Sequence, residues 1–285
     1  MMTPGASKLT DPVGDGEGAG LSHHRSMLLA QISDTHILSP ESDHPATSQR
    51  ADCLRQCVSD IEQQQPDAVI LTGDTVQHGQ PDEYAFLCEL LAPLSMPVYA
   101  VPGNRDDKLA MREAFGDKGF LPAAGDFLHY VVEGHPLRLV GIDSTSPEER
   151  KGVFCEERQA WLDSVLQEEP ERATLLFIHH PPFDVGDHYI NGYRRPDDAA
   201  ALAEVVSRHP QVVGLLCGHV HWPVECDWAG TVARIMPSVA VDVRKGVDET
   251  VAEHRPIYML HRLAEERKLV SEARMAATPD RGAQE

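Results

Sequence analysis

Short apolar runs alternate with longer amphipathic stretches along most of the chain. The first run, 27–33, is almost entirely apolar and predicts a strand that is buried on both faces. Apolar residues at helical spacing follow in 50–64 and predict a helix. The same alternation predicts further strands at 67–73, 97–103, 127–134, 137–144, 173–180, 212–221, 232–241 and 256–263, and helices at 82–94, 106–116, 156–169 and 197–208.

This order of elements predicts an α/β protein. Alternating strands and helices give parallel strands, because each helix carries the chain back to the same edge of the sheet. The strands that follow later in the chain add to a mixed sheet. We therefore expect two mixed sheets that pack face to face.

Both ends of the chain differ from this alternating region. Residues 1–26 are rich in Gly, Ser, Pro and Asp, which predicts a disordered tail. The glycine run at 14–20 has no strand before it, so we do not expect a dinucleotide-binding loop. Residues 264–285 are charged and small and predict a mobile C-terminal tail. One domain, residues 27–263, is expected between the tails.

The charge balance excludes several classes of partner. The formal net charge is -20, which disfavours nucleic-acid polymers and anionic membranes. A phosphate-bearing substrate would need local positive charge from a metal or from a few arginines. No apolar run reaches ~18 residues, so no membrane span is predicted. The 6 cysteines form no C-x-x-C pair and the chain starts without a signal-peptide layout, so we expect free thiols and a cytoplasmic location.

Polar side chains with metal-binding atoms follow several of the predicted strands. They are Asp34 and His36 in SDTH, Asp74 in TGD, Asn104 in PGN, His179 and His180 in IHHPP, and His219 and His221 in GHVH. Because the carboxyl ends of strands form the ligand-binding crevice of open α/β sheets, we expect these side chains to meet. In an extended segment, residues two apart face the same way, so Asp34 with His36, and His219 with His221, can each face one site.

The chemistry of these side chains indicates a metal centre. Carboxylate, imidazole and amide oxygen suit Mn, Fe, Co or Zn, and the thiolates of a structural zinc site are absent from the set. The groups are too many for one tetrahedral ion but fit two ions that share a carboxylate, for which Asp74 is the natural bridge. Two ions about 4 Å apart are a known arrangement for phosphoryl transfer, in which a bridging water becomes a hydroxide nucleophile.

The ordered motifs DTH, GD, GN, H before HPP, and GHVH resemble the signature of the calcineurin-type metallophosphoesterases over roughly residues 27–225. The sequences of several stretches, such as MLLAQISDTH and PVYAVPGNRDDK, are most similar to those of the bacterial glycerophosphodiesterase and class III cyclic-nucleotide phosphodiesterase branch. The resemblance implies a four-layer α/β/β/α sandwich with helices outside two mixed β-sheets. It also implies a cytoplasmic location and a dinuclear Mn, Fe, Co or Zn site. Several members oligomerise through their C-terminal part, so a homo-oligomer stays open.

The resemblance also implies a role for each residue. The ligands of the first metal would be Asp34, His36 and His221, those of the second Asn104, His179 and His219, and the bridge Asp74. We take His179 as the ligand because it follows the strand directly, whereas His180 precedes a proline. His180 is instead expected to contact substrate or to support the site.

Arg105 departs from the family pattern, which has a histidine after the asparagine, near the scissile phosphate and the leaving group. A guanidinium stays protonated, so Arg105 cannot act as a general acid. It can bind phosphate through a bidentate fork and stabilise charge in the transition state. Asp106 and Asp107 are expected to begin the next helix, where carboxylates favour the dipole.

These observations predict an enzyme that hydrolyses small phosphodiesters, either a glycerophosphodiester or a 3′,5′-cyclic nucleotide, by means of a metal-bridging hydroxide. The catalytic residues would be Asp74, Asn104 and Arg105, and the substrate contacts Asn104, Arg105 and His180. The alternatives are a broad-specificity phosphomonoesterase, a phosphonate monoester hydrolase and a non-catalytic metal-binding regulatory protein. The last is disfavoured because every ligand type is present. A DNA exonuclease is disfavoured by the acidic charge and the lack of a basic stripe.

Overall fold

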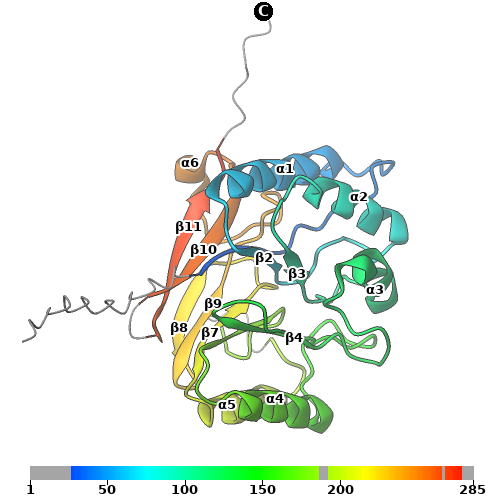
Figure 1. Cartoon of the computed structure of the whole chain (residues 1–285). Helices are drawn as coiled ribbons and strands as arrows, with labels where there is room; N and C mark the ends of the chain where they lie inside the picture. Colours follow the sequence, from blue (N-terminus) through cyan, green and yellow to red (C-terminus); the bar gives the residue numbers. More distant parts are fainter. Residues whose placement is uncertain (1–26, 186–191, 265–266, 278–285) are drawn as a thin grey trace, which may run out of the picture.

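Two β-sheets lie at the centre of the molecule, and helices cover the outer face of each (Figure 1). The computed structural model describes residues 27–185, 192–264 and 267–277, so the predicted tail at 1–26 lies outside the described residues. The first sheet has the order β11 (Leu269–Met275), β10 (Ile257–Leu263), β1 (Leu28–Ile32), β2 (Ala68–Leu71) and β3 (Val98–Ala100). The second sheet has the order β4 (Tyr130–Val132), β5 (Arg138–Ile142), β6 (Thr174–Ile178), β7 (Val212–Cys217), β9 (Thr231–Ile235) and β8 (Val224–Trp228).

Both sheets are mixed. Strands β1, β2 and β3 are parallel, as are β5, β6, β7 and β9, while β4, β8, β10 and β11 pair in the antiparallel sense. Parallel strands need long crossovers; helices supply these except between β7 and β9, where β8 lies between the two strands. The carboxyl ends of the parallel strands in each sheet consequently lie along one edge, where a ligand-binding crevice is expected.

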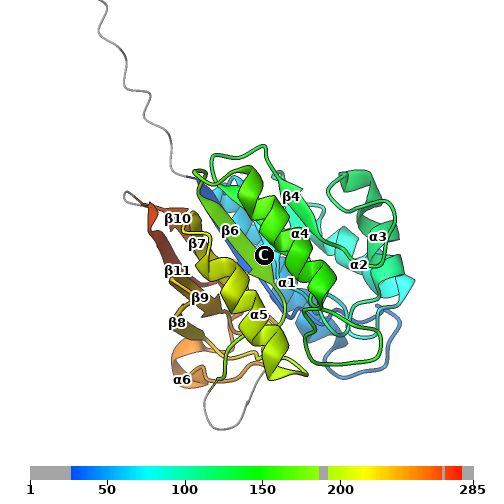
Figure 2. The ribbon, with the colours of Figure 1, turned by 90° about the horizontal axis from the view of Figure 1, so that it is seen from below.

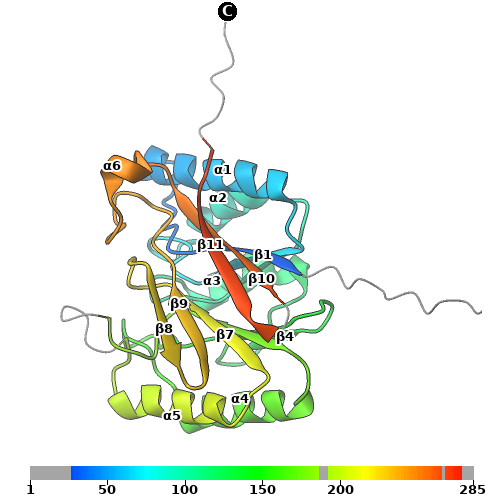
Figure 3. The ribbon, with the colours of Figure 1, turned by 90° about the vertical axis from the view of Figure 1, so that its left-hand side faces the viewer.

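The helices form the two outer layers. The first layer contains α1 (Thr47–Gln64), α2 (Pro81–Leu91) and α3 (Lys108–Phe115), and the second contains α4 (Glu156–Glu168) and α5 (Pro196–Ser207). Figure 2 shows α4 and α5 lying across the second sheet, and Figure 3 shows the sheets between the two helix layers. Short helices follow α3 at Gly116–Lys118 and precede β10 at α6 (Glu249–Ala252). The predicted α/β/β/α sandwich is confirmed.

The central strands are buried on both faces. In β1, Leu29 packs between the sheets and Ala30 packs under the first helix layer. In β6, Phe177 packs between the sheets and Leu176 under the second layer. Strands buried on both faces are apolar throughout, which is why the sequence pattern located them. Among the residues that the structure describes, no helix is long and apolar enough to cross a bilayer.

The structure corrects the predicted C-terminal tail. Strand β11 occupies Leu269–Met275, inside the 264–285 segment, and pairs along its whole length with β10. The strand lies at the sheet edge, where most of its residues, including Val270 and Glu272, are exposed. Such a mixed polar surface lacks the apolar run by which the central strands were predicted. Strand β8 went unpredicted for the same reason.

Candidate metal centre

The side chains that follow β1, β2, β6 and β7 meet in two adjoining groups. The first group contains Asp34, His36, Asp74 and His221, and the second contains His179, His180 and His219. Within each group, the candidate ligand atoms all lie within 4.8 Å of one another. The structure therefore brings together the residues that the sequence placed at separate strand ends.

Close contacts between potential ligand atoms hold the first group together. The Nε2 atom of His221 lies 3.2 Å from Asp34 Oδ1 and 3.1 Å from His36 Nε2. The Nδ1 atom of His221 donates to the carbonyl of Val243, so its Nε2 is left to face the group. Ligand atoms that bind one ion at about 2.0–2.2 Å stand roughly 3–3.5 Å apart, and these contacts have that spacing.

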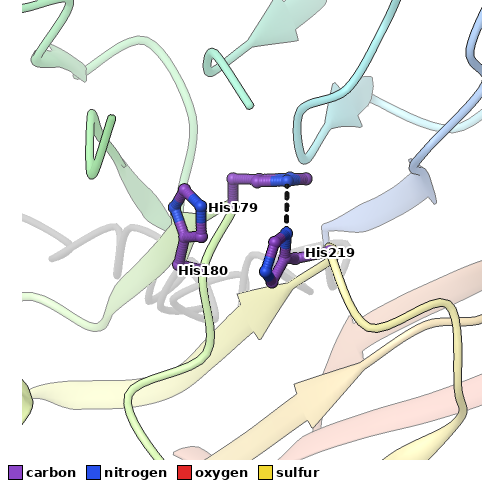
Figure 4. A group of neighbouring side chains, drawn as sticks. All are labelled: His179, His180 and His219. Carbon is purple, nitrogen blue, oxygen red and sulfur yellow. Dashed lines mark hydrogen bonds between the residues drawn. The ribbon is translucent and has the colours of Figure 1, made fainter. Parts of the chain in front are cut away.

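Asp74 lies between the two groups. Its Oδ2 is 3.9 Å from His36 Nε2 in the first group, and its Oδ1 is 3.5 Å from His179 Nε2 in the second. In the second group, His179 Nε2 lies 3.2 Å from His219 Nδ1, the contact drawn as a dashed line in Figure 4. One carboxylate thus presents an oxygen to each group, which is the placement that a bridging ligand needs.

The amide of Asn104 fits a cation. Its Oδ1 atom is buried and has no hydrogen-bond partner among the described residues. A buried acceptor without a donor destabilises a protein by about 1–3 kcal/mol, so such atoms need a partner. A metal ion beside the second group would supply one, and oxygen ligands of this type suit hard and borderline cations.

The two consecutive histidines after β6 differ in which ring nitrogens are free. His179 Nδ1 donates to the carbonyl of Thr72 at 2.7 Å, and its Nε2 faces Asp74 and His219. His180 accepts a hydrogen bond from Ser144 Oγ at 2.8 Å and lies 3.1 Å from the carbonyl of Arg150 through Nε2. His180 is also fully buried. Both ring nitrogens of His180 are therefore engaged, which favours the expected support of the site over a substrate contact and leaves His179 as the candidate ligand.

Most of the candidate ligands have left-handed backbone conformations. The φ angles are 53° for Asp34, 46° for His36, 47° for Asp74, 73° for His219 and 63° for His221. Non-glycine residues in this region carry strain that clusters at functional sites. The i, i+2 pairs were expected to be extended, and the left-handed φ angles contradict this. Asp34 and His36 nevertheless face the same group, while His219 lies in the second group and His221 in the first, which is the division that the resemblance implies.

The electrostatics of the site favour neutral histidines and added positive charge. Burial lowers the pKa of His36 to about 3 and that of His219 well below its ordinary value. Their lone pairs are therefore available at neutral pH. Burial also raises the pKa of Asp74 to about 7, although His179 opposes this shift. A cation bound nearby would favour the ionised Asp74, because an opposite charge lowers the pKa of a carboxyl group.

Comparison with known proteins identifies the family. Residues 27–223 match the family described as calcineurin-like phosphoesterase. The chain belongs to this family. It is 32% identical over 251 residues to the probable glycerophosphodiester phosphodiesterase GpdQ of Arcobacter nitrofigilis, covering 86% of this chain and 92% of the relative. It is 29% identical over 226 residues to the 3′,5′-cyclic adenosine monophosphate phosphodiesterase CpdA of Escherichia coli, covering 79% and 80%.

A solved structure has the same fold as this phosphoesterase. The dimetal phosphatase from Danio rerio aligns with a TM-score of 0.68 at 18% identity, covering 88% of this chain and 96% of that one. The predicted family is confirmed, and the relatives confirm the predicted class of a metal-dependent phosphodiester hydrolase.

The turn that follows β3 in this phosphoesterase is held by a partly buried carboxylate. Asp106 accepts hydrogen bonds from Gly103 N at 2.8 Å, Thr75 Oγ1 at 2.6 Å and Tyr84 Oη at 3.0 Å. Asp106 was expected to begin α3, but only Asp107 caps that helix, by accepting from the amide of its third residue at 2.9 Å. Nothing in the sequence separates the two adjacent aspartates, so this role of Asp106 was missed.

Arg105 is attached to the candidate bridge through its backbone. Its amide N–H donates to Asp74 Oδ1 at 2.7 Å. Arg105 lines a cavity of about 850 Å³, which also borders Asn104 and Arg150. Most arginines that the structure describes have a side-chain hydrogen bond or an ion pair. The exceptions, which have neither within the described residues, are Arg105, Arg150 and Arg262.

Proposed function

We propose that this phosphoesterase hydrolyses small phosphodiesters at a dinuclear metal centre, with Arg105 as a ligand for the phosphoryl group. The observation that carries the proposal is the placement of Asp74, whose two oxygens face two separate groups of ligand atoms. The proposed metal ligands are Asp34, His36, Asp74 and His221 for one ion, and Asp74, Asn104, His179 and His219 for the other.

The metal ions, Asp74 and Arg105 have separate roles in the proposed reaction. Two bound metal ions would supply an acidified water as nucleophile and positive charge for the phosphoryl oxygens. Asp74 fixes the relative position of the two groups, and the amide of Arg105 fixes the orientation of Asp74. Arg105 lines the cavity, and because its guanidinium has no hydrogen bond or ion pair within the described residues, it can bind the phosphoryl oxygens through a fork. Because it stays protonated, it stabilises charge and transfers no proton.

The cavity supports a small anionic substrate. Its volume of about 850 Å³ is in the range of small-molecule sites. Arg105 and Arg150 line the cavity and have no ion pair within the described residues, although the chain as a whole has a net charge of -20. Relatives named for glycerophosphodiesters and for cyclic adenosine monophosphate support these two substrate classes.

The location and assembly of the enzyme are part of the same proposal. The six cysteines are all free thiols, which supports a reducing cytoplasm. A homo-oligomer formed through the C-terminal part of the chain is supported by the resemblance alone. Size-exclusion chromatography with light scattering measures the mass directly.

A metal-reconstitution screen tests the proposed function. The metal-free protein is loaded with Mn, Fe, Co or Zn and assayed on a chromogenic phosphodiester, a phosphomonoester, cyclic adenosine monophosphate and glycerophosphoethanolamine. We expect turnover of diesters in preference to the monoester with at least one metal. A preference for the monoester would contradict the diesterase assignment. An absence of turnover with every metal would favour the regulatory alternative.

Replacing Arg105 tests its contact with the phosphoryl group. We expect Arg105→Ala to lower kcat/KM by roughly 10- to 100-fold, because a hydrogen bond to a charged group contributes about 1.5–3 kcal/mol. The factor should be similar for diesters with good and poor leaving groups, since the guanidinium contacts the phosphoryl oxygens. Arg262→Ala, at an arginine outside the cavity, is the control. Unchanged activity in Arg105→Ala would remove Arg105 from the site.

A further inference from the structure

The proposed function leaves the leaving group without a proton donor. When a phosphodiester with an alkyl leaving group is cleaved, the departing oxygen needs a proton, and a positioned donor contributes about 10²–10⁴-fold. Arg105 cannot supply this proton. Within the described residues that line the cavity, His78 is the only histidine. We propose that His78, held by Glu83, is the general acid that protonates the leaving-group oxygen. This inference rests on the proposed function.

Glu83 fixes the orientation of the His78 ring. The Glu83 carboxylate is buried, and one of its oxygens accepts the backbone N–H groups of His78 at 2.8 Å and Gln80 at 3.2 Å. Its other oxygen lies 2.9 Å from His78 Nδ1. Glu83 occupies the third position of α2, so the start of that helix sets its place. With Nδ1 held, Nε2 is the nitrogen that remains to act on a substrate, as in other carboxylate–histidine pairs.

The loop that carries His78 packs against the turn that carries Arg105. Gly79 has a φ of 71°, and a Cβ atom there would lie 3.2 Å from the carbonyl oxygen of Arg105. The amide of Arg105 in turn binds Asp74. Two contacts in series therefore connect the His78 loop to the candidate bridge. The His78 side chain is 58% exposed, so solvent can reach the ring from the cavity.

The proton transfer balances without another reactant. As the attacking oxygen forms its bond to phosphorus, the bond from phosphorus to the leaving oxygen breaks. The leaving oxygen takes the proton from Nε2 of the His78 imidazolium and departs as an alcohol. The Glu83 carboxylate stabilises the imidazolium before the step. Water then returns a proton to the neutral ring.

A substitution with two substrates tests this role. We expect His78→Gln to lower kcat/KM about 100-fold or more on an alkyl phosphodiester, and to change it little on a nitrophenyl phosphodiester, whose leaving group needs no proton. Glu83 from α2 contacts the ring and does not change in the variant.

Two further variants separate catalysis from structure. His254→Gln is the matched control, because His254 is also an exposed histidine beside a glutamate, 3.6 Å from Glu249, but lies outside the cavity. The double variant His78→Gln with Arg105→His should regain activity on the alkyl diester, because it returns an imidazole to the site. Metal content and thermal unfolding should match wild type in His78→Gln.

The outcomes separate the two proposals. An equal loss on both substrates in His78→Gln, or no loss on either, would overturn the assignment of His78. The proposed function would still stand in that case, because wild type would hydrolyse diesters. If wild type hydrolyses neither diester with any metal, the proposed function fails, and the role of His78 fails with it.

Discussion

We expect Asp74→Asn to lower kcat/KM by about 10³-fold or more, since losing metal stabilisation of the transition state removes several kcal/mol. The amide cannot replace the carboxylate at both ends. Oδ1 accepts the N–H of Arg105, and Oδ2 faces His36 in the first group. If the amide oxygen keeps the Arg105 contact, its NH₂ faces the first metal position and offers no lone pair. We therefore expect bound metal to fall from two ions per chain toward one.

Metal content measured by mass spectrometry, together with kcat/KM, checks this prediction. Asp117→Asn is the matched control, because Asp117 is an exposed aspartate outside the cavity and its carboxylate has no partner within the described residues. It should keep both ions and full activity. If Asp74→Asn keeps two tightly bound ions and wild-type turnover, Asp74 does not bridge the metals.

The strand ends could be predicted from the sequence because the central strands are buried on both faces. Strands such as β1 and β6 pack against another layer on each face, so they are apolar throughout and stop abruptly at polar residues. Parallel strands place those stops at one edge. Asp34 and His179 therefore share a site although they are 145 residues apart in the sequence.

The sequence did not reveal the backbone of the site. Asp34 and His36 were expected on an extended segment, but both have left-handed φ angles. Tertiary hydrogen bonds impose this conformation: the amide of Asp34 donates to the carbonyl of Gly73, and that of His36 to the carbonyl of Asp74, each at 3.0 Å. Such contacts join separate strands, and local pattern does not encode them.

The side chains that support the site could also not be predicted from the sequence pattern. His180 and His179 are adjacent and identical, and only the folded chain shows that Ser144 and Arg150 occupy both nitrogens of His180. Likewise, the Glu83 that orients His78 is typical of the first turn of any helix. Its second role depends on which loop packs beside it.

We expect Gly103→Ala to disable the site although glycine carries no chemistry. A Cβ atom at this position would lie 2.2 Å from Asp74 N and 2.3 Å from Asp74 Oδ1. The first of these is backbone, so the turn itself must move. A shift of 1 Å in a site lowers activity by about 10²-fold, and overpacking of this kind destabilises a fold by about 1–3 kcal/mol. We expect losses of activity, metal content and thermal stability together.

The comparison with a second glycine makes this test specific. Gly116 ends α3 with a φ of -56°, and a Cβ atom there would meet nothing within 4 Å. Gly116→Ala should therefore leave stability within about 0.5 kcal/mol of wild type. Gly103 precedes α3 and Gly116 ends it, and each variant removes one glycine, so the two share the entropic effect on the unfolded chain. The difference between them isolates the close approach of Gly103 to Asp74. If Gly103→Ala retains both metals and full turnover, the metal centre does not depend on the close approach of Gly103 to Asp74. The turn after β3 could then move away from the Asp74 carboxylate without loss of activity.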